Sequence, residues 1–481
     1  MSNPQADPKK GAAVTAADHS YVFHSWSAQG QIAPIPVAGS SGSRFWDYDG
    51  KTYLDFSSQL VFTNIGHQHP KVVKAIQDQA ATLTALAPQH SNDARNEAAQ
   101  RIVELAGGHF RKVFFTNGGA DAIENAIRMA RLHTNKHKVL STYRSYHGNT
   151  GSAINATGDP RRFPNEFSFG HVHFWGPYLY RSAFLSTTEE EECQRALAHL
   201  EQMIIFEGPN TIAAILIESI GGTAGVLVPP KGYLEGLRAL CDKYKILWIA
   251  DEVMSGFGRA GKWFAYQNSA ATPDLITFAK GVTSGYVALG GVVISEHISN
   301  TFNDRVFPGG LTYSGHPLAC AAAVATIDVM KEEKMLENAT MIGEKVFGPG
   351  LIELAKKHKV IGDIRGGGVF WGIDIVTSRT TRNPMAAYGG TSPEMNELVA
   401  ACKAAGLMPF NNFNRIHLCP PCNISVEDAQ LGLEMLDKAL ESVAKYYKEY
   451  IPRIDLNVKA ELDYVAICHN VIFAFHSNFA L

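Results

Sequence analysis

The spacing of apolar residues changes along the chain and predicts two kinds of element. Apolar residues recur every three or four positions over residues 70–84, 92–106 and 234–245, which is the period of a helix with one buried face. Short, almost wholly apolar runs alternate with helix-length segments, as buried parallel strands do. These runs cover residues 112–116, 137–142, 211–218, 246–251, 274–279 and 290–295. The alternation predicts an α/β fold with a mostly parallel sheet and helices on both faces.

The two ends of the chain predict a second, smaller unit. Residues 44–56 carry the Asp49-Gly50 dipeptide between two aromatic-rich runs, which is the signal of a hairpin. After residue 320 helical patterns return, interrupted by strands near 360–376 and 414–419. We therefore expect a frayed arm (1–20), the first part of a small α+β domain (21–65), a large domain (66–325), the rest of the small domain (326–450) and a tail whose structure the pattern does not define (451–481).

Composition excludes several classes of partner. The 481 residues carry 43 Lys and Arg against 46 Asp and Glu, and a net charge of −3 gives no basic footprint for nucleic acid or an anionic membrane. The longest apolar stretch, residues 318–325, is far shorter than a membrane span, and no signal peptide is recognised. The cysteines are odd in number and scattered, so we expect no disulfide framework and a cytoplasmic location. They are Cys193, Cys241, Cys320, Cys402, Cys419, Cys422 and Cys468.

Three of the predicted strands end at ionisable residues. Glu218, Asp251 and Lys280 each follow an apolar run, and open parallel sheets bind ligands at that end of their strands. One such residue is most often the solvated end of its strand, but three on neighbouring strands indicate a site. A lysine near apolar or cationic groups has a lowered pKa and can form a Schiff base, and an aspartate can keep a pyridine nitrogen protonated. Lys280 and Asp251 therefore point to pyridoxal 5'-phosphate as cofactor.

A phosphate site is predicted between the strand 112–116 and the amphipathic segment that follows it. Asn117, Gly118, Gly119 and Ala120 form this connection. The glycines leave space for backbone N–H groups at the start of the helix to approach a phosphate. A Gly-Gly pair before a helix is more often a plain loop, so this motif is weak by itself.

Other motifs have structural interpretations. Residues 256–261 match G-x-G-x-x-G, but they follow Asp251 after a gap and lead into a poor helix, so no dinucleotide site is predicted. No metal site is predicted either, because the one C-x-x-C pair has no second pair and two histidine pairs have no carboxylate or cysteine nearby in the sequence. These residues are Cys419 and Cys422, interpreted as buried thiols, His67 and His69, and His171 and His173.

Longer segments resemble a known family. IADEVMSGFGRAGKWFA (249–265), DLITFAKGVTSGY (274–286) and GGLTYSGHPLACAAA (309–323) are similar to the signature of class III pyridoxal-phosphate aminotransferases, which have fold type I. WDYDGKTYLDFSSQ, NIGHQHPKVVKAI, VFFTNGGADAIENAIRMAR and YRSYHGNTGSA resemble further segments of the family in the same order. The likeness covers residues 20–445, and the order and spacing of the motifs make it specific.

The resemblance implies a role for the residues around the cofactor ring. Lys280 would form the Schiff base with the cofactor and move the proton of the substrate carbon, and Asp251 would pair with the ring nitrogen. Tyr146 and Val253 would cover the two faces of the ring. Glu218 would support Asp251 and the ring hydroxyl.

The same resemblance assigns the phosphate group to Gly118, Gly119 and Ala120, and it implies that Thr312 reaches the phosphate bound by a partner subunit. A complete site would then need a homodimer, with a tetramer as the alternative. The cup lacks the hydroxyl residue common in the family, so backbone donors and Thr312 carry more of the binding. Thr223 replaces the glutamate that masks an arginine in relatives acting on 4-aminobutyrate or ornithine.

The substrate is expected to bind through a cation. Arg415 is the candidate, because a guanidinium group binds a carboxylate in two-point fashion; an ordinary core-edge arginine is the alternative. An unmasked Arg415 would suit ω-amino acids or sulfonates such as β-alanine or taurine, with pyruvate or 2-oxoglutarate as acceptor. Phe23, Leu60 and Val61 match pocket-lining positions of the family, and the aliphatic Val61 leaves simple amines open as donors.

These observations predict an aminotransferase that works by two ping-pong half-reactions. Fold and lysine do not set the reaction, so an aminomutase, epimerase or decarboxylase of the same fold is the alternative. A binding protein that keeps the cofactor without turnover is the alternative outside enzymes.

Overall fold

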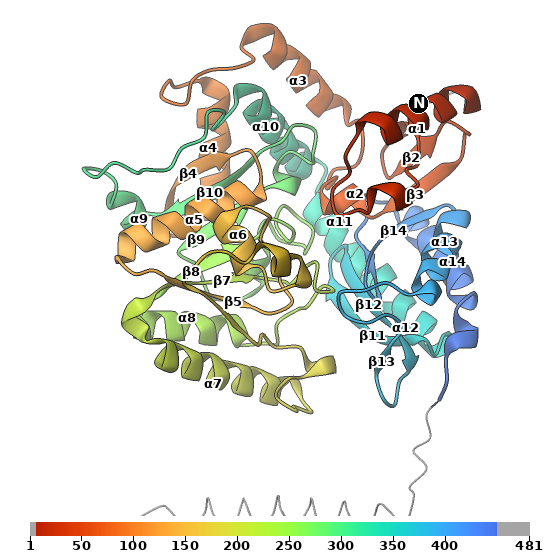
Figure 1. Ribbon diagram of the computed structural model, residues 1–481. Helices are drawn as coiled ribbons and strands as arrows, with labels where there is room; N and C mark the ends of the chain where they lie inside the picture. The colour runs from red at the N-terminus through yellow and green to blue at the C-terminus, as the bar shows by residue number, and fades with distance from the viewer. Residues whose placement is uncertain (1–5, 450–481) are drawn as a thin grey trace, which may run out of the picture.

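A seven-stranded sheet forms the centre of the large lobe of the protein (Figure 1). The computed structural model describes residues 6–449. The strand order is β4-β10-β9-β8-β7-β5-β6, and only β10 is antiparallel to its neighbours. The strands are β4 (Phe110–Thr116), β5 (Lys138–Thr142), β6 (His171–Phe174), β7 (Ile212–Glu218), β8 (Leu247–Asp251), β9 (Leu275–Phe278) and β10 (Gly290–Ser295). The predicted, mostly parallel sheet is confirmed.

Alternate residues of these strands pack against helices on opposite faces of the sheet. Ile249 joins the core made with α5 (Gly119–Thr134) and α6 (Gly151–Ala156), whereas Trp248 and Ala250 join the core made with α7 (Glu189–Glu207) and α8 (Tyr233–Tyr244). Since both faces are covered, nearly every residue of the central strands β7 to β10 is buried. The α/β class with helices on both faces is confirmed.

The sequence patterns predicted some of the helices but not all of them. The helices α3 (Pro70–Thr82), α4 (Asp93–Ala106) and α8 confirm the three predicted segments. Helix α7 was not predicted, although its start carries a clear signal: the Thr188 hydroxyl accepts a hydrogen bond from the Glu191 N–H at 3.2 Å, and acidic residues fill the first turn. Both features stabilise the positive end of a helix.

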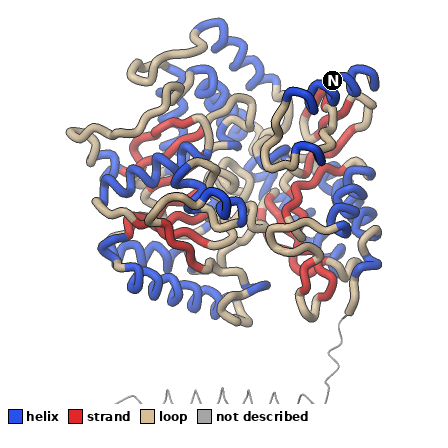
Figure 2. The backbone as a smooth tube through the Cα atoms, in the orientation of Figure 1, coloured by secondary structure: helices blue, strands red, loops and turns tan. Residues whose placement is uncertain are grey.

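A second sheet forms the small lobe and joins residues 37–56 to residues 361–418 (Figure 2). Its order is β1-β2-β3-β14-β15-β12-β11, with β13 on β12, and β3 pairs in parallel with β14, so the N-terminal hairpin packs with the C-terminal part as predicted. The strands are β1 (Val37–Ser41), β2 (Arg44–Asp47), β3 (Thr52–Phe56), β11 (Ile361–Gly367), β12 (Phe370–Ser378), β13 (Asn383–Pro384), β14 (Leu407–Asn412) and β15 (Arg415–Leu418). The remaining helices are α2 (Ser58–Val61), α9 (Glu296–Asn300), α10 (Pro317–Glu332), α11 (Met335–Ile342), α12 (Gly348–Lys357), α13 (Pro393–Ala404) and α14 (Val426–Glu441).

The N-terminal segment differs from the prediction of a frayed arm. Residues Pro8–Tyr21 form helix α1, capped by Asp7, whose carboxylate accepts from the Lys10 N–H at 3.1 Å. The Asp7 N–H donates to the Tyr48 carbonyl at 2.8 Å, and Gly11 is buried where a Cβ would lie 2.9 Å from the Tyr48 Cβ. Contact with the hairpin turn thus orders a segment that has no amphipathic pattern of its own.

Some predictions fall on residues that are not described. The tail 451–481, with Cys468, lies outside the described residues; the six other cysteines are buried free thiols. Within residues 6–449, no helix is long and apolar enough to cross a membrane.

Candidate active site

The ionisable strand ends meet in one cavity, as the strand-end argument predicted. Glu218 of β7 is paired in register with Asp251 of β8, and Lys280 follows the next strand, β9, after one residue. All three line a cavity of about 490 Å³. Figure 2 shows loops in the region between the two groups of strands.

The surroundings of Lys280 favour the uncharged form of its amine. It begins a short 3-10 turn, Lys280–Val282, at φ +46°, a left-handed conformation that non-glycine residues adopt only under constraint. Burial lowers the pKa of the Lys280 amine, and the charges of Arg161 and Arg259 lower it further, against the opposite effect of Asp251 and Glu218. A larger fraction of neutral amine is therefore present at a given pH, which is what a nucleophile or proton acceptor needs.

Asp251 is held by a histidine that the sequence analysis did not select. Its Oδ2 lies 2.7 Å from Nδ1 of His147, and its Oδ1 accepts from the Val253 N–H at 3.0 Å. Asp251 is only 3% exposed, and Nε2 of His147 has no hydrogen-bond partner among the described residues. The one available signal for His147 was its place beside Tyr146, since 104 residues separate it from Asp251.

Glu218 is a buried carboxyl group that accepts two backbone hydrogen bonds. They come from the Tyr146 N–H at 3.2 Å and the Gly222 N–H at 2.7 Å. Burial raises the pKa of Glu218 to about 7; the charge of Asp251 acts in the same direction and His147 opposes it. Glu218 therefore titrates close to neutral pH, unlike an exposed glutamate.

This shift has a consequence for stability that can be measured. The folded protein keeps the Glu218 proton between about pH 4.5 and 7 while the unfolded chain loses it, so stability falls as the pH rises through this window, by about 3 kcal/mol for 2.5 pKa units. Urea unfolding of the cofactor-free protein at pH 5 and pH 8 is expected to show that Glu218→Gln gains this amount relative to wild type at the higher pH.

The matched control is Glu190→Gln, at an exposed position of α7. Any constant cost of the amide at position 218 cancels between the two pH values. An equal difference from wild type at both would contradict the raised pKa.

The Gly-Gly motif forms the predicted connection from strand to helix. Gly118 precedes the first residue of α5, Gly119, and residues 117–120 all line the cavity. A Cβ on Gly118 would meet nothing within 4 Å, whereas one on Gly119 would lie 2.8 Å from Cγ1 of Val253. Gly119 thus lets Val253 pack against the start of the helix, and the free N–H groups there can hold an anion.

The other predicted cofactor residues are distributed as follows. Tyr146 and Val253 line the cavity. Thr312 does not line it in the single chain and is exposed, in the loop between α9 and α10.

None of the four predicted substrate residues lines this cavity in the single chain. Phe23 and Leu60 are exposed, Val61 is buried beside the cavity residue Met254, and Arg415 lies in the small lobe. Their sequence neighbours Ser25, Trp26 and Phe62 line the cavity instead. Contacts of the four predicted residues with substrate stay predictions.

A different arginine, Arg161, contacts Tyr146, a residue that lines the cavity. The guanidinium group of Arg161 is 3.6 Å from the ring centre of Tyr146. Its Nε donates to Asp159 Oδ2 at 2.9 Å and its Nη2 also donates to that carboxylate, while its Nη1 has no hydrogen bond within the described residues, and the side chain is 31% exposed. Nη1 of Arg161 is therefore available to a ligand, and the charge of this arginine acts on the Lys280 amine although 119 residues separate the two in sequence.

The histidine pairs correct one statement of the sequence analysis. His67 Nε2 lies 2.9 Å from Asp55 and His69 Nε2 lies 2.9 Å from Glu333, so carboxylates do reach both imidazoles through the fold. Residues 6–449 hold no group of three or more His, Cys, Asp or Glu side chains arranged to bind a metal ion. Cys419 and Cys422 are buried thiols, as predicted.

Comparison with known proteins agrees with this arrangement. The family model described as Aminotransferase class-III matches residues 26–440. The taurine--pyruvate aminotransferase of Bilophila wadsworthia is 33% identical over 91% of this chain and 98% of its own length, and 5-aminovalerate aminotransferase DavT of Pseudomonas aeruginosa is 34% identical over 86% and 95%. A solved structure of taurine:2-oxoglutarate aminotransferase from Bifidobacterium kashiwanohense, in complex with PLP and glutamate, has a TM-score of 0.88 and 43% identity over 92% of this chain and 99% of that one.

The chain therefore belongs to the class III aminotransferases. It is a pyridoxal-phosphate-dependent transaminase of fold type I. Amino transfer is the reaction that the sequence predicted, with aminomutase, epimerase and decarboxylase activities as alternatives. The cavity suits this cofactor: the start of α5 can hold a phosphate, Asp251 can face a ring nitrogen, and the Lys280 amine has no hydrogen bond to the described residues. The predictions of family, fold, enzyme class and cofactor are confirmed.

Proposed function

We propose that this enzyme transfers the amino group of a taurine-like ω-amino acid to 2-oxoglutarate by a ping-pong mechanism. The position of Arg161 carries this proposal. A donor of this kind has an amine at one end and an acid group at the other, so the amine can reach Lys280 while the sulfonate or carboxylate binds the free edge of Arg161. The relatives named for taurine support the donor, and the 43% identical relative named for 2-oxoglutarate supports the acceptor.

Within this function we propose the following roles. The bound cofactor supplies an electron sink that acidifies the C–H bond beside the substrate nitrogen. Lys280 Nζ would accept that proton and return it, since its lowered pKa favours the neutral amine. Asp251, fixed by His147, holds the proton on the ring nitrogen.

The remaining cofactor residues have binding roles in this proposal. Tyr146 and Val253 cover the two faces of the ring, and Glu218 holds the Tyr146 backbone in place. Backbone donors at Gly118, Gly119 and Ala120 bind the phosphate group.

The function is tested by product analysis. The purified holoenzyme is incubated with taurine, β-alanine, 4-aminobutyrate or propylamine, each with 2-oxoglutarate or pyruvate, and the glutamate or alanine formed is measured. We expect the highest rate for taurine with 2-oxoglutarate. Production of neither amino acid from any pair would contradict the proposal, and alanine as the faster product would replace the acceptor.

Removing the Arg161 guanidinium is expected to weaken donors that carry an acid group. A charge-assisted hydrogen bond contributes about 1.5–3 kcal/mol, so Arg161→Met should raise KM for taurine about 10- to 150-fold and leave KM for propylamine unchanged. Steady-state kinetics with the two donors measure this difference.

Arg162→Met is the matched control. This neighbour donates to the Gly158 carbonyl and lies over the rings of Tyr143 and Phe163 rather than over Tyr146. An equal rise in KM for both donors in Arg161→Met would show that the arginine supports the cavity without binding the acid group.

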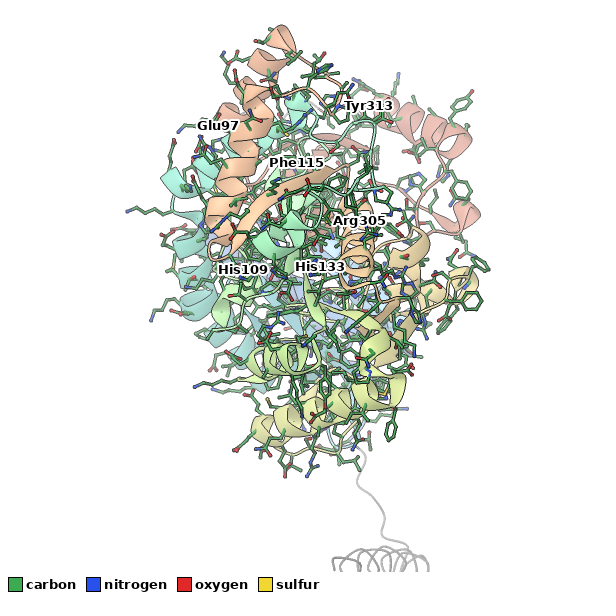
Figure 3. All side chains as sticks on the ribbon, turned by 90° about the vertical axis from the view of Figure 1, so that its left-hand side faces the viewer. Glu97, His109, Phe115, His133, Arg305 and Tyr313 are labelled. Atoms are coloured by element: carbon green, nitrogen blue, oxygen red, sulfur yellow. The ribbon has the colours of Figure 1, made fainter. Side chains whose placement is uncertain are left out.

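We also propose that the enzyme is a homodimer, because Thr312 stands away from the cavity of its own chain. The loop between α9 and α10 extends from the large lobe on the side away from the small lobe, and Figure 3 shows Arg305 and Tyr313 of this loop on that face. Val306 and Tyr313 are 86% and 62% exposed there, so this face offers apolar side chains to a second chain.

Sedimentation is expected to give twice the chain mass of 52.4 kDa. Four chains would indicate the tetramer, and one chain would contradict the role of Thr312. The cytoplasm stays the proposed compartment, supported by the six buried free thiols.

A further inference from the structure

The loop 256–261 places an arginine in the interior of the protein, where the large lobe meets the small one. This loop matches G-x-G-x-x-G, and no dinucleotide site is predicted for it. Gly258 and Gly261 have φ of +89° and +77°, a conformation that glycine adopts readily in tight turns. The side chain of Arg259, between these two glycines, is fully buried. The motif thus brings a guanidinium group into the core.

The hydrogen bonds of the Arg259 guanidinium all go to neutral groups of the small lobe. Nη2 donates to Asn64 Oδ1 at 2.7 Å, and Nη1 donates to the carbonyl groups of Pro420 at 2.9 Å and Val369 at 3.4 Å. Nε has no partner, and no carboxylate of residues 6–449 lies within 4.0 Å of this arginine. A buried charge without an opposite charge is unfavourable, so packing alone does not explain a cation at this position.

The charge of Arg259 acts on three ionisable groups. Two are the buried thiols of Cys419 and Cys422, whose pKa values burial raises to about 12 and about 11 against the effect of the arginine, so both stay neutral. The third is the amine of Lys280, whose pKa is lowered by burial and further by the charges of Arg161 and Arg259. The buried charge therefore favours the neutral form of the Lys280 amine.

Asn64 connects Arg259 to the turn that begins with Lys280. Its Oδ1 accepts from Arg259, and its Nδ2 donates to the Phe257 carbonyl at 2.7 Å. The side chain is held at both ends, and the residue is 1% exposed. A Cβ on Gly281 would lie 2.4 Å from that Nδ2, so the amide packs directly against the residue that follows Lys280.

A second contact holds the other end of this turn. The N–H group of Ile65, next to Asn64, donates to Ser284 Oγ at 3.0 Å. Lys280 and Ser284 have φ of +46° and +54°, left-handed conformations that such residues keep only when their surroundings hold them. Asn64 and Ile65 thus contact the turn at positions 281 and 284, and Arg259 fixes the first of these contacts.

We propose that Arg259 is a positioning residue for Lys280: its guanidinium fork holds the turn 280–284 through Asn64, and its charge favours the neutral amine. Arg259 is not among the residues that line the cavity, so it acts without touching the cofactor. The inference rests on the role proposed for Lys280. In that role Nζ adds to the aldehyde carbon of pyridoxal phosphate, a C=N bond replaces the C=O bond, and the oxygen leaves as water with the two amine protons.

Reconstitution of the cofactor-free full-length enzyme tests the proposal, because it separates binding from bond formation. Absorbance records Schiff-base formation after pyridoxal phosphate is added, whereas pyridoxamine phosphate has no aldehyde, and its Kd, measured by protein fluorescence, reports binding alone. In Arg259→Met the rate at saturating pyridoxal phosphate should fall about 10- to 100-fold, since displacing a reacting group by about 1 Å has an effect of this size. The Kd of pyridoxamine phosphate should stay unchanged.

The pH dependence of this rate separates the charge from the fork. Loss of the charge raises the pKa of the Lys280 amine, so the rate profile of Arg259→Met should move to higher pH. Asp251, Glu218 and Arg161 also act on this amine, but they are the same in both proteins. Arg259→Lys keeps the charge and loses the fork, so its profile should keep the wild-type position with a lower plateau.

Arg101→Met is the matched control. Arg101 is a partly buried arginine of α4 that pairs with Glu97 and Asp328, and it does not line the cavity. Its loss should leave the rate and the pH profile unchanged. If Arg259→Met fails to fold, Asn64→Ala decides: it removes the contact with Gly281 and keeps the charge, so the plateau should fall without a shift in pH.

Two results would overturn the proposal. One is a wild-type rate and pH profile in Arg259→Met, or a wild-type plateau in Asn64→Ala where that variant decides. The other is a slower rate matched by an equal loss of pyridoxamine phosphate affinity with no shift in pH, which would make Arg259 a structural residue only. A Schiff base formed as fast in Lys280→Ala as in wild type would instead contradict the role proposed for Lys280.

Discussion

Lys280→Ala is expected to lower the rate of glutamate formation from taurine and 2-oxoglutarate at least about 10⁴-fold, because both the nucleophile and the proton acceptor are lost. Among the described residues that line the cavity, Lys280 is the only lysine. Initial rates measured at saturating cofactor test this expectation. The variant should melt no lower than wild type, since a buried amine that resists protonation is removed.

Lys262→Ala is the control for Lys280. Lys262 lies in the same part of the chain but is exposed and does not line the cavity. It should keep the wild-type rate. A Lys280→Ala enzyme with more than a hundredth of the wild-type rate would move the proton transfer to another residue.

Asp251→Asn should give the second largest loss. The side chain keeps its size, and the His147 imidazole can still donate to it, but the negative charge beside the cofactor ring disappears. Breaking a buried charge pair costs about 3–5 kcal/mol, which corresponds to a fall in kcat of about 10²- to 10⁴-fold. The fall should appear in single-turnover rates with either substrate, because both half-reactions use the same ring.

Asp242→Asn supplies the comparison for Asp251. Asp242 is on α8, is 67% exposed and pairs with Arg238 at the surface. It should leave kcat unchanged. A loss in Asp251→Asn confined to cofactor affinity, with kcat restored at high cofactor concentration, would reduce Asp251 to a binding residue.

The large lobe could be predicted closely because its signals are local. A buried strand is a short apolar run whatever its neighbours are, and each predicted run overlaps one of the strands β4, β5 and β7 to β10. Helix α1 shows the limit of such signals: its residues carry no amphipathic pattern, and the contact with Tyr48 orders them. Strand β14 was not predicted either, since its burial arises from pairing with β3 and β15.

The active cavity was predictable only in part. Glu218, Asp251 and Lys280 could be found because parallel strands end at one edge of the sheet, and residues 117–120 because a strand, glycines and a helix follow in order. His147 and Arg161 could not, since their importance lies in contacts with Asp251 and Tyr146. Arg415 was selected for its charge, and its neighbours in space decide what it can bind.

The sequence by itself determined the α/β class and the cofactor and supplied Glu218, Asp251 and Lys280 as candidates for the chemistry, because periodicity and strand ends are properties of neighbouring residues. Only the tertiary structure decided which arginine contacts Tyr146, a residue that lines the cavity. The register of β12 and β15 directs Arg415 toward Asp374, while the turn after Asp159 lays Arg161 over Tyr146. Side-chain direction depends on strand pairing and loop geometry, and residues far apart in the chain set both.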